Sequence, residues 1–236
     1  MARVVTIHQP NYLPWIGLFS KIMQADCFII YDNAQYTTGG VIHRNKIRTR
    51  NGWLYLTVPV SKHLGKSRIC DVPLPEEKRW RKDHWRTIYQ NYVRSPFFKD
   101  YGGFFKELYQ QSFELLCQLN EKILLYVLNC FGIKVEVIKA SEMKIDPVLR
   151  KTDLMLAYLK CAGADIYLSG PSGRNYLEAE KFPQNNMGLK YFAFQHPVYQ
   201  QRYPGFEPNL SAIDLLFNEG PAACQLIKKS GLIEDG

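Results

Sequence analysis

The sequence lacks the features that mark membrane-spanning and secreted proteins. No apolar run approaches the roughly 18 residues that a membrane span needs. Only residues 4–7 form an apolar or β-branched run before His8, so we expect no secretory signal peptide. The six cysteines are widely spaced and form no C-x-x-C pair. We therefore expect reduced thiols and a cytoplasmic protein without a membrane span.

The motifs of the common metal and nucleotide sites are also missing. The five histidines show neither H-x-x-x-H nor H-E-x-x-H spacing, so no metal site is expected. No Gly-Lys-Ser/Thr ending marks a phosphate-binding loop of the Walker A type. The chain has no Gly/aromatic RNA-binding signature, zinc finger or long basic run, which makes nucleic acid an unlikely partner.

What the chain does have is an ordinary globular composition with an excess of positive charge. Its 236 residues are 46% hydrophobic and 22% charged, enough to bury a full core. The net charge is +8, and much of it lies between residues 43 and 106. A basic half suggests an anionic small molecule or an acidic carrier protein as partner. A solvated basic face is the alternative interpretation.

The beginning of the chain concentrates the strongest site signal. Residues 4–7 predict a short buried strand, because they are β-branched or apolar and breakers follow. The loop after them carries His8 and is stiffened by Pro10 and Pro14, which fix φ. Ligands of open α/β sheets bind at the carboxyl ends of strands. The loop is therefore a candidate site, and a structural histidine with a core aromatic is the alternative.

Two strand–helix–strand units predict the fold class. The first covers residues 4–31, and the second covers residues 134–168 with a helix over 151–161. This alternation favours an α/β fold with a mixed, mostly parallel sheet flanked by helices. We expect a single domain over residues 1–236.

The segment between these units has a different pattern. Residues 41–60 predict an antiparallel hairpin around the Asn51-Gly52 turn, with a basic face. A short strand is expected over 69–72, and one long packing helix over 101–131. We therefore expect residues 41–133 to form an inserted hairpin and helical segment, or a lid.

A second loop follows a buried strand in the carboxyl-terminal half. The strand over 165–168 leads directly into Ser169-Gly170-Pro171-Ser172-Gly173 and then Arg174. Backbone amides and Arg174 in such a loop can hold an anion. A plain turn is the alternative. We expect this loop, the His8 loop and the loop after residues 27–31 to converge on one cleft.

Some polar residues have structural interpretations. Ser211 and Asp214 fit a helix cap and its capping-box acid. His84 shares a helix face with Trp80, which is typical of a histidine at the edge of a core.

Taken in order, the motifs resemble the WbqC-like family of bacterial proteins. They are HQPNYLPWIG at 8–17, AD-x-F-x-x-x-D at 25–32, RNKI at 44–47, LTVPV at 56–60, W-x-x-x-H at 80–84, YLSG-x-x-G-x-x-YL at 167–177, HPVYQQ at 196–201 and F-x-PNLSAIDLLFN at 206–218. The resemblance covers almost the whole chain. It implies a link to polysaccharide, O-antigen and related cell-surface glycan biosynthesis, and it brings no defined reaction.

The resemblance also implies a set of site residues. A polar set that recurs on strand ends and loops looks like that of an enzyme. It maps here to His8, Gln9, Tyr12, Asp32, Gln35, Arg44, Asn45, His84, Ser169, Tyr176, Tyr199, Gln201 and Asp214.

The first functional hypothesis is group transfer, with acyl or aminoacyl transfer to an amino group of a nucleotide-linked sugar or similar metabolite. His8 acts as general base, because its pKa lies near operating pH. Asp32 orients His8, and Arg44 and Arg174 hold phosphate. Arg44 is expected to face the cleft from the hairpin. The acyl donor is a phosphopantetheine thioester on an acidic carrier protein.

Two other classes remain open. A nucleotidylyltransferase-like enzyme would bind a nucleotide, and strand, His-containing loop, helix and strand ending in Asp resemble the opening of the H-x-G-H enzymes. Here, however, Gln-Pro-Asn follows His8. The third class is a non-catalytic binding module of a glycan assembly complex, which predicts that no group near His8 has a perturbed pKa.

Overall fold

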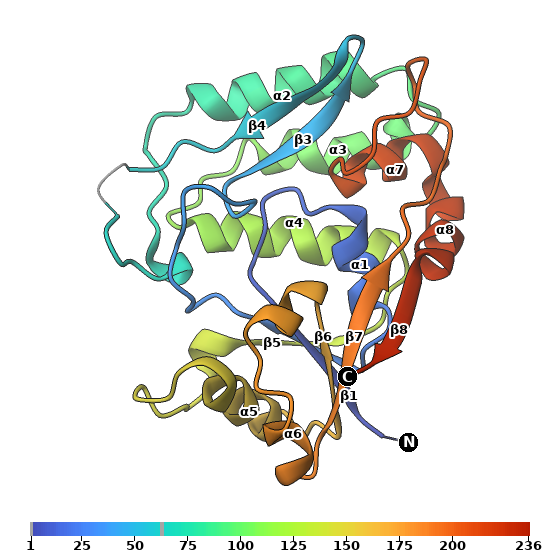
Figure 1. Cartoon of the computed structure of the whole chain (residues 1–236). Coiled ribbons are helices and arrows are strands. Elements are labelled where there is room, and N and C mark those ends of the chain that lie inside the picture. Colours follow the sequence, from blue (N-terminus) through green and yellow to red (C-terminus); the bar gives the residue numbers. More distant parts are fainter. Residues whose placement is uncertain (1, 62–63) are drawn as a thin grey trace.

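A six-stranded mixed sheet forms the centre of the computed structural model, which describes residues 2–61 and 64–236 (Figure 1). The strand order is β5-β2-β1-β6-β7-β8, and only the β7–β8 pair is antiparallel. This confirms the predicted α/β class. The strands are β1 (Val4–His8), β2 (Cys27–Ile30), β5 (Glu136–Lys139), β6 (Ile166–Ser169), β7 (Gly188–Phe194) and β8 (Gly231–Asp235).

The central position of β1 sets the topology. From β1 the chain builds outward on one side through β2 and β5, and then crosses to the other side to add β6 and β7. Val5 pairs with Cys27 of β2, and Val4 pairs with Ile166 of β6. The strand order therefore reverses between β1 and β6. In open α/β sheets this is the switch point at which ligands bind.

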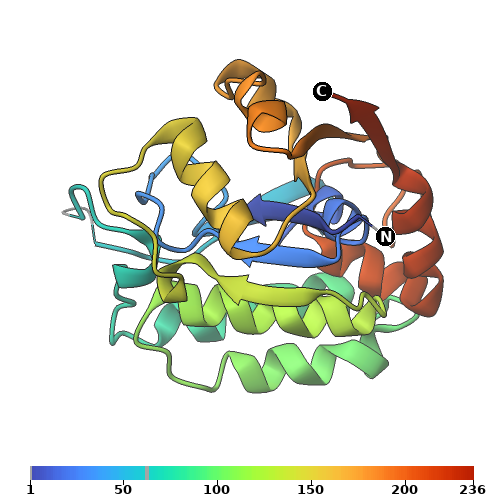
Figure 2. The same cartoon turned by 90° about the horizontal axis from the view of Figure 1, so that it is seen from below.

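Side chains that alternate along the strands pack into two separate cores, one on each face of the sheet. Phe28 and Ile30 join a large core on one face, whereas Val5, Ile7 and Ile29 join a smaller core on the other. Figure 2 shows the sheet between these layers, with the yellow helix α5 and orange helical segments above it and the green helices below. The large core contains α1 (Ile16–Ile22), α2 (Arg79–Tyr92), α3 (Phe98–Leu108), α4 (Leu116–Cys130), α7 (Ala212–Glu219) and α8 (Ala223–Ser230). The smaller core contains α5 (Lys151–Cys161) and α6 (Lys181–Gln184).

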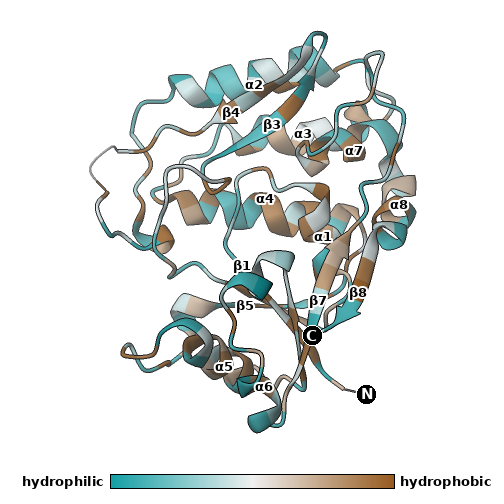
Figure 3. Ribbon diagram, in the orientation of Figure 1, coloured by the Kyte–Doolittle hydropathy of each residue, from teal (hydrophilic) through white to brown (hydrophobic). Residues whose placement is uncertain are grey.

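The predicted hairpin is present as a separate two-stranded sheet. It consists of β3 (Arg44–Thr49) and β4 (Gly52–Thr57), which pair antiparallel. Gly52 has φ +111°, a conformation that suits glycine. The hairpin and α2 lie at the end of the molecule farthest from α5 (Figure 1). Figure 3 shows hydrophilic residues along much of α2 and hydrophobic residues on α4 and α5.

Three elements differ from the sequence-based expectation. The expected long helix over 101–131 is two helices, α3 and α4, because the chain leaves the helical path between them: Leu115 is extended, and the amide of Leu116 bonds to the carbonyl of Val72. The expected strand over 69–72 is a 3₁₀ turn, Ile69–Asp71, that packs against α4. Strand β8 was not predicted. Its side chains are mostly exposed, so they carry little of the apolar pattern by which strands are recognised.

Gly17 allows the Trp15 ring to lie against α1. A Cβ atom at Gly17 would overlap with that ring, whereas a Cβ atom at Gly103 of α3 would meet no atom. We predict that Gly17→Ala destabilises the protein by about 1–3 kcal/mol through overpacking. Gly103→Ala should instead stabilise it by about 0.5–1 kcal/mol, because alanine is the better helix former.

Denaturant unfolding of both variants measures the two free energies. Equal effects of the two substitutions would show that Trp15 moves away from Gly17 without cost.

Candidate functional site

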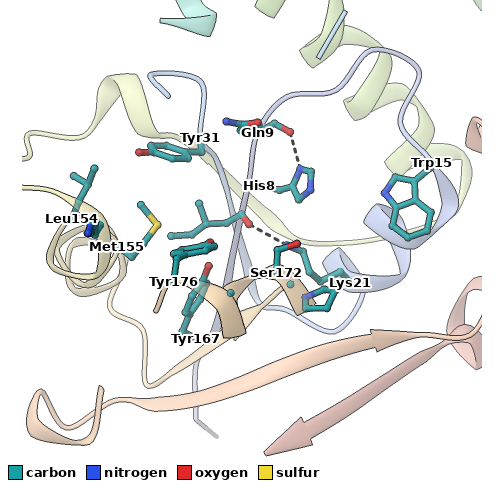
Figure 4. Close-up of a pocket in the computed structure, with 15 residues that line it drawn as sticks. His8, Gln9, Trp15, Lys21, Tyr31, Leu154, Met155, Tyr167, Ser172 and Tyr176 are labelled. Atoms are coloured by element: carbon teal, nitrogen blue, oxygen red, sulfur yellow. Dashed lines mark hydrogen bonds between the residues drawn. The ribbon is translucent and has the colours of Figure 1, made fainter. Parts of the chain in front are cut away.

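A cavity of about 520 Å³ lies over the carboxyl ends of β1 and β6, at the switch point of the sheet (Figure 4). Its size suits a small-molecule ligand. The three loops expected to converge do so: His8 and Gln9 lie where β1 ends, Tyr31 follows β2, and Gly170 follows β6. Further lining comes from Ile7, Gln9, Trp15, Lys21, Lys151, Leu154, Met155, Tyr167, Pro171, Ser172, Gly173 and Tyr176.

His8 stands at the end of β1 with its ring partly accessible through the cavity. Its Nδ1 lies 2.9 Å from the carbonyl oxygen of Gln9. Because a carbonyl only accepts, this contact assigns the proton to Nδ1 and leaves Nε2 unprotonated. Burial, together with the positive charge of Lys21, lowers the pKa of His8 to about 4. The imidazole is therefore neutral at pH 7, with a free lone pair, and its pKa lies below the near-neutral value expected from the sequence.

Lys21 brings a buried ammonium group to the same cavity. The residue is 3% exposed, and its Nζ donates to the carbonyl of Ile7 at 3.0 Å. Burial lowers the pKa of Lys21 to about 7. Among the residues that the structure describes, no carboxylate pairs with it. Figure 4 shows Lys21, His8 and Ser172 on one side of β1.

Aromatic rings form much of the remaining wall. Tyr31 and Tyr176 lie across β1 from His8 in Figure 4, and Tyr167 lies beneath Tyr176. Tyr176 is 53% exposed, so its ring is available to a ligand. Trp15 packs edge-on against Phe194 with ring centroids 4.9 Å apart. The cavity therefore combines an apolar aromatic wall with one basic corner.

Of the residues named by the resemblance, few line the cavity. His8, Gln9 and Tyr176 do so. Ser169 is buried immediately before the lining loop, and its hydroxyl donates to the carbonyl of Gly170 at 3.1 Å.

Asp32 does not orient His8, contrary to the sequence-based expectation. Both of its carboxylate oxygens accept hydrogen bonds from Ser141, the backbone amide at 2.8 Å among them. The carbonyl of Gln9 orients the imidazole instead. A main-chain partner of this kind has no sequence signature, whereas an aspartate after a strand does.

Arg44 and Arg174, which were expected to hold a phosphate in this cleft, do not line the cavity. Arg44 lies on the separate hairpin, where its guanidinium sits 4.8 Å from the centroid of the Tyr55 ring. Arg174 pairs with Glu234 of β8 at 2.8 Å and lies over the Tyr191 ring.

Buried hydrogen bonds hold the His8 loop in place, and they involve Tyr12, His84 and Asn45. The Tyr12 hydroxyl contacts Nδ1 of His84 at 2.8 Å and the hydroxyl of Tyr109. Asn45 donates to the carbonyl of Leu13 at 2.7 Å. These groups are buried, and burial lowers the pKa of His84 to about 4. His84 is thus a core-edge histidine, as its aromatic stripe indicates.

The remaining predicted residues lie away from the cavity. Tyr199 donates to Asp214 at 2.8 Å, and burial raises the pKa of that carboxyl group to about 6. The Gln201 side chain bonds to the backbone of Glu207 at 2.8 and 2.9 Å. Gln35 is exposed on the loop after β2.

Of the two residues predicted to cap the start of α7, Ser211 does so and Asp214 does not. The Ser211 hydroxyl accepts from the amide of Ile213 at 3.4 Å, which confirms Ser211 as the cap. Asp214 does not complete a capping box, because its carboxylate accepts from Tyr199 instead.

The described residues contain neither a metal-binding cluster nor a membrane-spanning helix. Across residues 2–61 and 64–236, no group of three or more His, Cys, Asp or Glu is placed to hold a metal. His63, one of the five histidines, lies outside the described residues. No helix in the same part of the chain is long and apolar enough to cross a membrane.

Lys21 is a site residue that sequence reasoning missed. It is the single charged residue in the buried helix Ile16–Ile22, and this isolation is the only signal.

Replacement of Lys21 by methionine removes a buried charge, so we predict that Lys21→Met stabilises the fold by about 1–4 kcal/mol below pH 7. In the folded state the lysine pKa is lowered from 10.5 to about 7. The cost of burying the charge is therefore complete below pH 7 and disappears as pH rises toward 10.5.

Denaturant unfolding of wild type and Lys21→Met at pH 6 and pH 9 measures this difference. A gain that is the same at both pH values would contradict a lowered lysine pKa.

Comparisons with known proteins agree with the sequence motifs. The profile of the WbqC-like protein family matches residues 9–226. A protein of Mycobacterium tuberculosis, named "Uncharacterized protein Rv1507c", is 32% identical over 223 residues, which cover 94% of this chain and 96% of that protein. No solved structure matches the chain. With this match over nearly its whole length, the chain belongs to the WbqC-like protein family.

Proposed function

We propose that this protein is a cytoplasmic group-transfer enzyme that moves an acyl or aminoacyl group onto an amino group of an anionic small molecule. The pathway context is the synthesis of cell-surface glycans or related metabolites. One observation carries the proposal: a neutral His8 lies beside the buried Lys21 in a cavity of about 520 Å³. A positioned base next to a desolvated cation suits acyl transfer, in which an amine loses a proton and a carbonyl oxygen gains negative charge.

His8 supplies the base. In the free protein its Nε2 is unprotonated and has no hydrogen-bond partner among the described residues, while Nδ1 is held by Gln9. As the substrate amine attacks the acyl carbonyl carbon, Nε2 takes the amine proton. The same proton then goes to the leaving thiolate when the C–S bond of a phosphopantetheine thioester breaks. No net proton is gained or lost by the protein.

Lys21 supplies the positive charge. The carbonyl oxygen of the acyl group becomes negative as the amine adds, and a fixed cation in a water-poor site stabilises that charge strongly. The hydrogen bond to Ile7 fixes the Lys21 side chain before the substrate arrives. Bound negative charge raises the pKa of both His8 and Lys21, because it offsets the repulsion and burial that lower them.

A non-catalytic binding module fits the site less well. That alternative predicts groups of ordinary pKa near His8, yet the pKa values of both His8 and Lys21 are lowered. Such perturbation clusters at functional sites, although burial alone also produces it.

Nucleotidyl transfer is the second candidate, and the strand order favours it. The parallel strands β5-β2-β1-β6-β7 follow the order of dinucleotide-binding folds, with the cavity at the same switch point. In that case Lys21 would neutralise a phosphate rather than an oxyanion. This support is an analogy of fold, whereas the acyl-transfer proposal rests on the groups in the cavity.

The test is release of thiol from acetyl-coenzyme A and other acyl-coenzyme A thioesters in the presence of a panel of nucleotide-linked amino sugars. We predict that His8→Gln lowers kcat/KM by about 100- to 10,000-fold, the usual contribution of a general base. His196→Gln is the matched control, because His196 lies outside the cavity and donates to a backbone carbonyl in the same manner.

Mass spectrometry of the acceptor identifies the new amide. Release of pyrophosphate from nucleoside triphosphates instead of thiol would favour nucleotidyl transfer. Unchanged turnover in folded His8→Gln would remove His8 from the reaction.

A further inference from the structure

A second chamber opens beside the first and has a different character. Its volume is about 440 Å³, and it shares Tyr31 and Leu154 with the cavity that contains His8. Asn33, Arg68, Arg150 and Tyr158 contribute polar groups to its wall. A ligand that fills both chambers must therefore pass over Tyr31 and Leu154, and it must be longer than a monosaccharide.

One cation of the second chamber is free to bind an anion. Arg68 is already engaged by Asp71 through two hydrogen bonds of 2.7 and 3.0 Å. Arg150 instead uses only Nη1, which donates to backbone carbonyls, that of Leu149 at 2.7 Å among them. In the part of the chain that the structure describes, its Nε and Nη2 have no partner and no carboxylate pairs with it. The guanidinium keeps both its charge and most of its donors.

The next residue places a second cation in the first chamber. Lys151 lines the His8 cavity, and its amine has no partner among the described residues. Its backbone has φ +49°, a left-handed conformation that costs a non-glycine residue energy. Consecutive residues thus line different chambers, Arg150 in one and Lys151 in the other. Leu154, about one helical turn farther along α5, lines both chambers.

The carboxylates near this junction already accept hydrogen bonds from the chain. Asp32 accepts from Ser141, and Asp146, which lines the second chamber, accepts from the amide of Val148 at 2.9 Å. The lining thus places one cation in each chamber, Lys151 in the first and Arg150 in the second. A ligand group that suits it has adjacent negative charges, one for each cation, and organic parts that extend in both directions.

We propose that Arg150 and Lys151 bind the pyrophosphate bridge of a diphosphate-linked ligand, with one organic end in each chamber. This proposal rests on the proposed function, because the end beside His8 is the one that reacts. Two sources share this chemistry. A nucleotide-linked sugar would place its sugar near His8 as acceptor, and coenzyme A would place its pantetheine arm there as donor.

Binding is tested by calorimetric titration with UDP and ADP, and with UMP and AMP as single-phosphate references. We predict that a diphosphate binds more tightly than its monophosphate, and that Arg150→Ala and Lys151→Gly each weaken diphosphate binding at least about tenfold. Titration with UDP-N-acetylglucosamine and with coenzyme A then shows which source adds affinity beyond the bare diphosphate.

The choice of variants separates binding from folding. Glycine tolerates the positive φ at position 151, so Lys151→Gly should unfold at the same or a higher denaturant concentration than wild type. Arg86→Ala on α2 is the charge-matched control, since Arg86 is exposed and pairs with Asp83 away from both chambers. Its diphosphate affinity should change less than about twofold.

Several results would overturn the proposal: monophosphates that bind as tightly as diphosphates, no diphosphate binding at all, or equal losses in Arg86→Ala and Arg150→Ala. The outcome is separable from that of the proposed function. Diphosphate binding that depends on Arg150 and Lys151, without any thioester turnover, would refute acyl transfer alone. Turnover that depends on His8 and is indifferent to both cations would refute the pyrophosphate site alone.

Discussion

The burial of the Lys21 ammonium group at the end of β1 is the constraint on which the site depends. A buried charge is costly, and here one hydrogen bond to the Ile7 carbonyl is its only partner among the described residues. That hydrogen bond links α1 to β1, the strand that precedes it in the chain. It also places a positive charge beside His8, which helps to keep the imidazole neutral. The fold thus tolerates an unfavourable group where an anionic ligand would benefit from it.

The topology explains why the site lies there. β1 is central and is flanked by β2 and β6. The connection that leaves β1 leads to β2 on one side, whereas the connection that leaves β6 leads to β7 on the other side. Separate cores cover the two faces of the sheet. The carboxyl ends of β1 and β6 lie between the two cores, and the loops that line the cavity follow them. Residues Tyr12, Asn45 and His84 then hold the His8 loop rigid from the side of the large core.

Local sequence signals predicted the framework well. The β-branched strand before His8, the Asn51-Gly52 hairpin and the strand before Ser169 are encoded by neighbouring residues, and each is present. The convergence of their loops followed from a general property of parallel sheets.

The partners of individual side chains were not predictable in this way. Arg44 and Arg174 are basic residues near polar motifs, but Arg44 lies over Tyr55 of the same hairpin, and long-range packing directs Arg174 to Glu234. Lys21 was missed for the opposite reason, because a lone lysine in an apolar helix resembles a solvent-facing residue until the tertiary structure buries it. The 3₁₀ turn at Ile69 likewise depends on contacts with α4 that lie far away in the sequence.

The central claim is that a neutral His8 stands beside a buried cation in a ligand cavity. The most direct test is an NMR titration of the His8 imidazole, assigned with the His8→Gln variant, in the free protein and in the presence of UDP. The account predicts that His8 titrates at a pKa of about 4 in the free protein and at a higher pKa when the diphosphate is bound. An ordinary pKa near 6.5 that does not respond to UDP would contradict it.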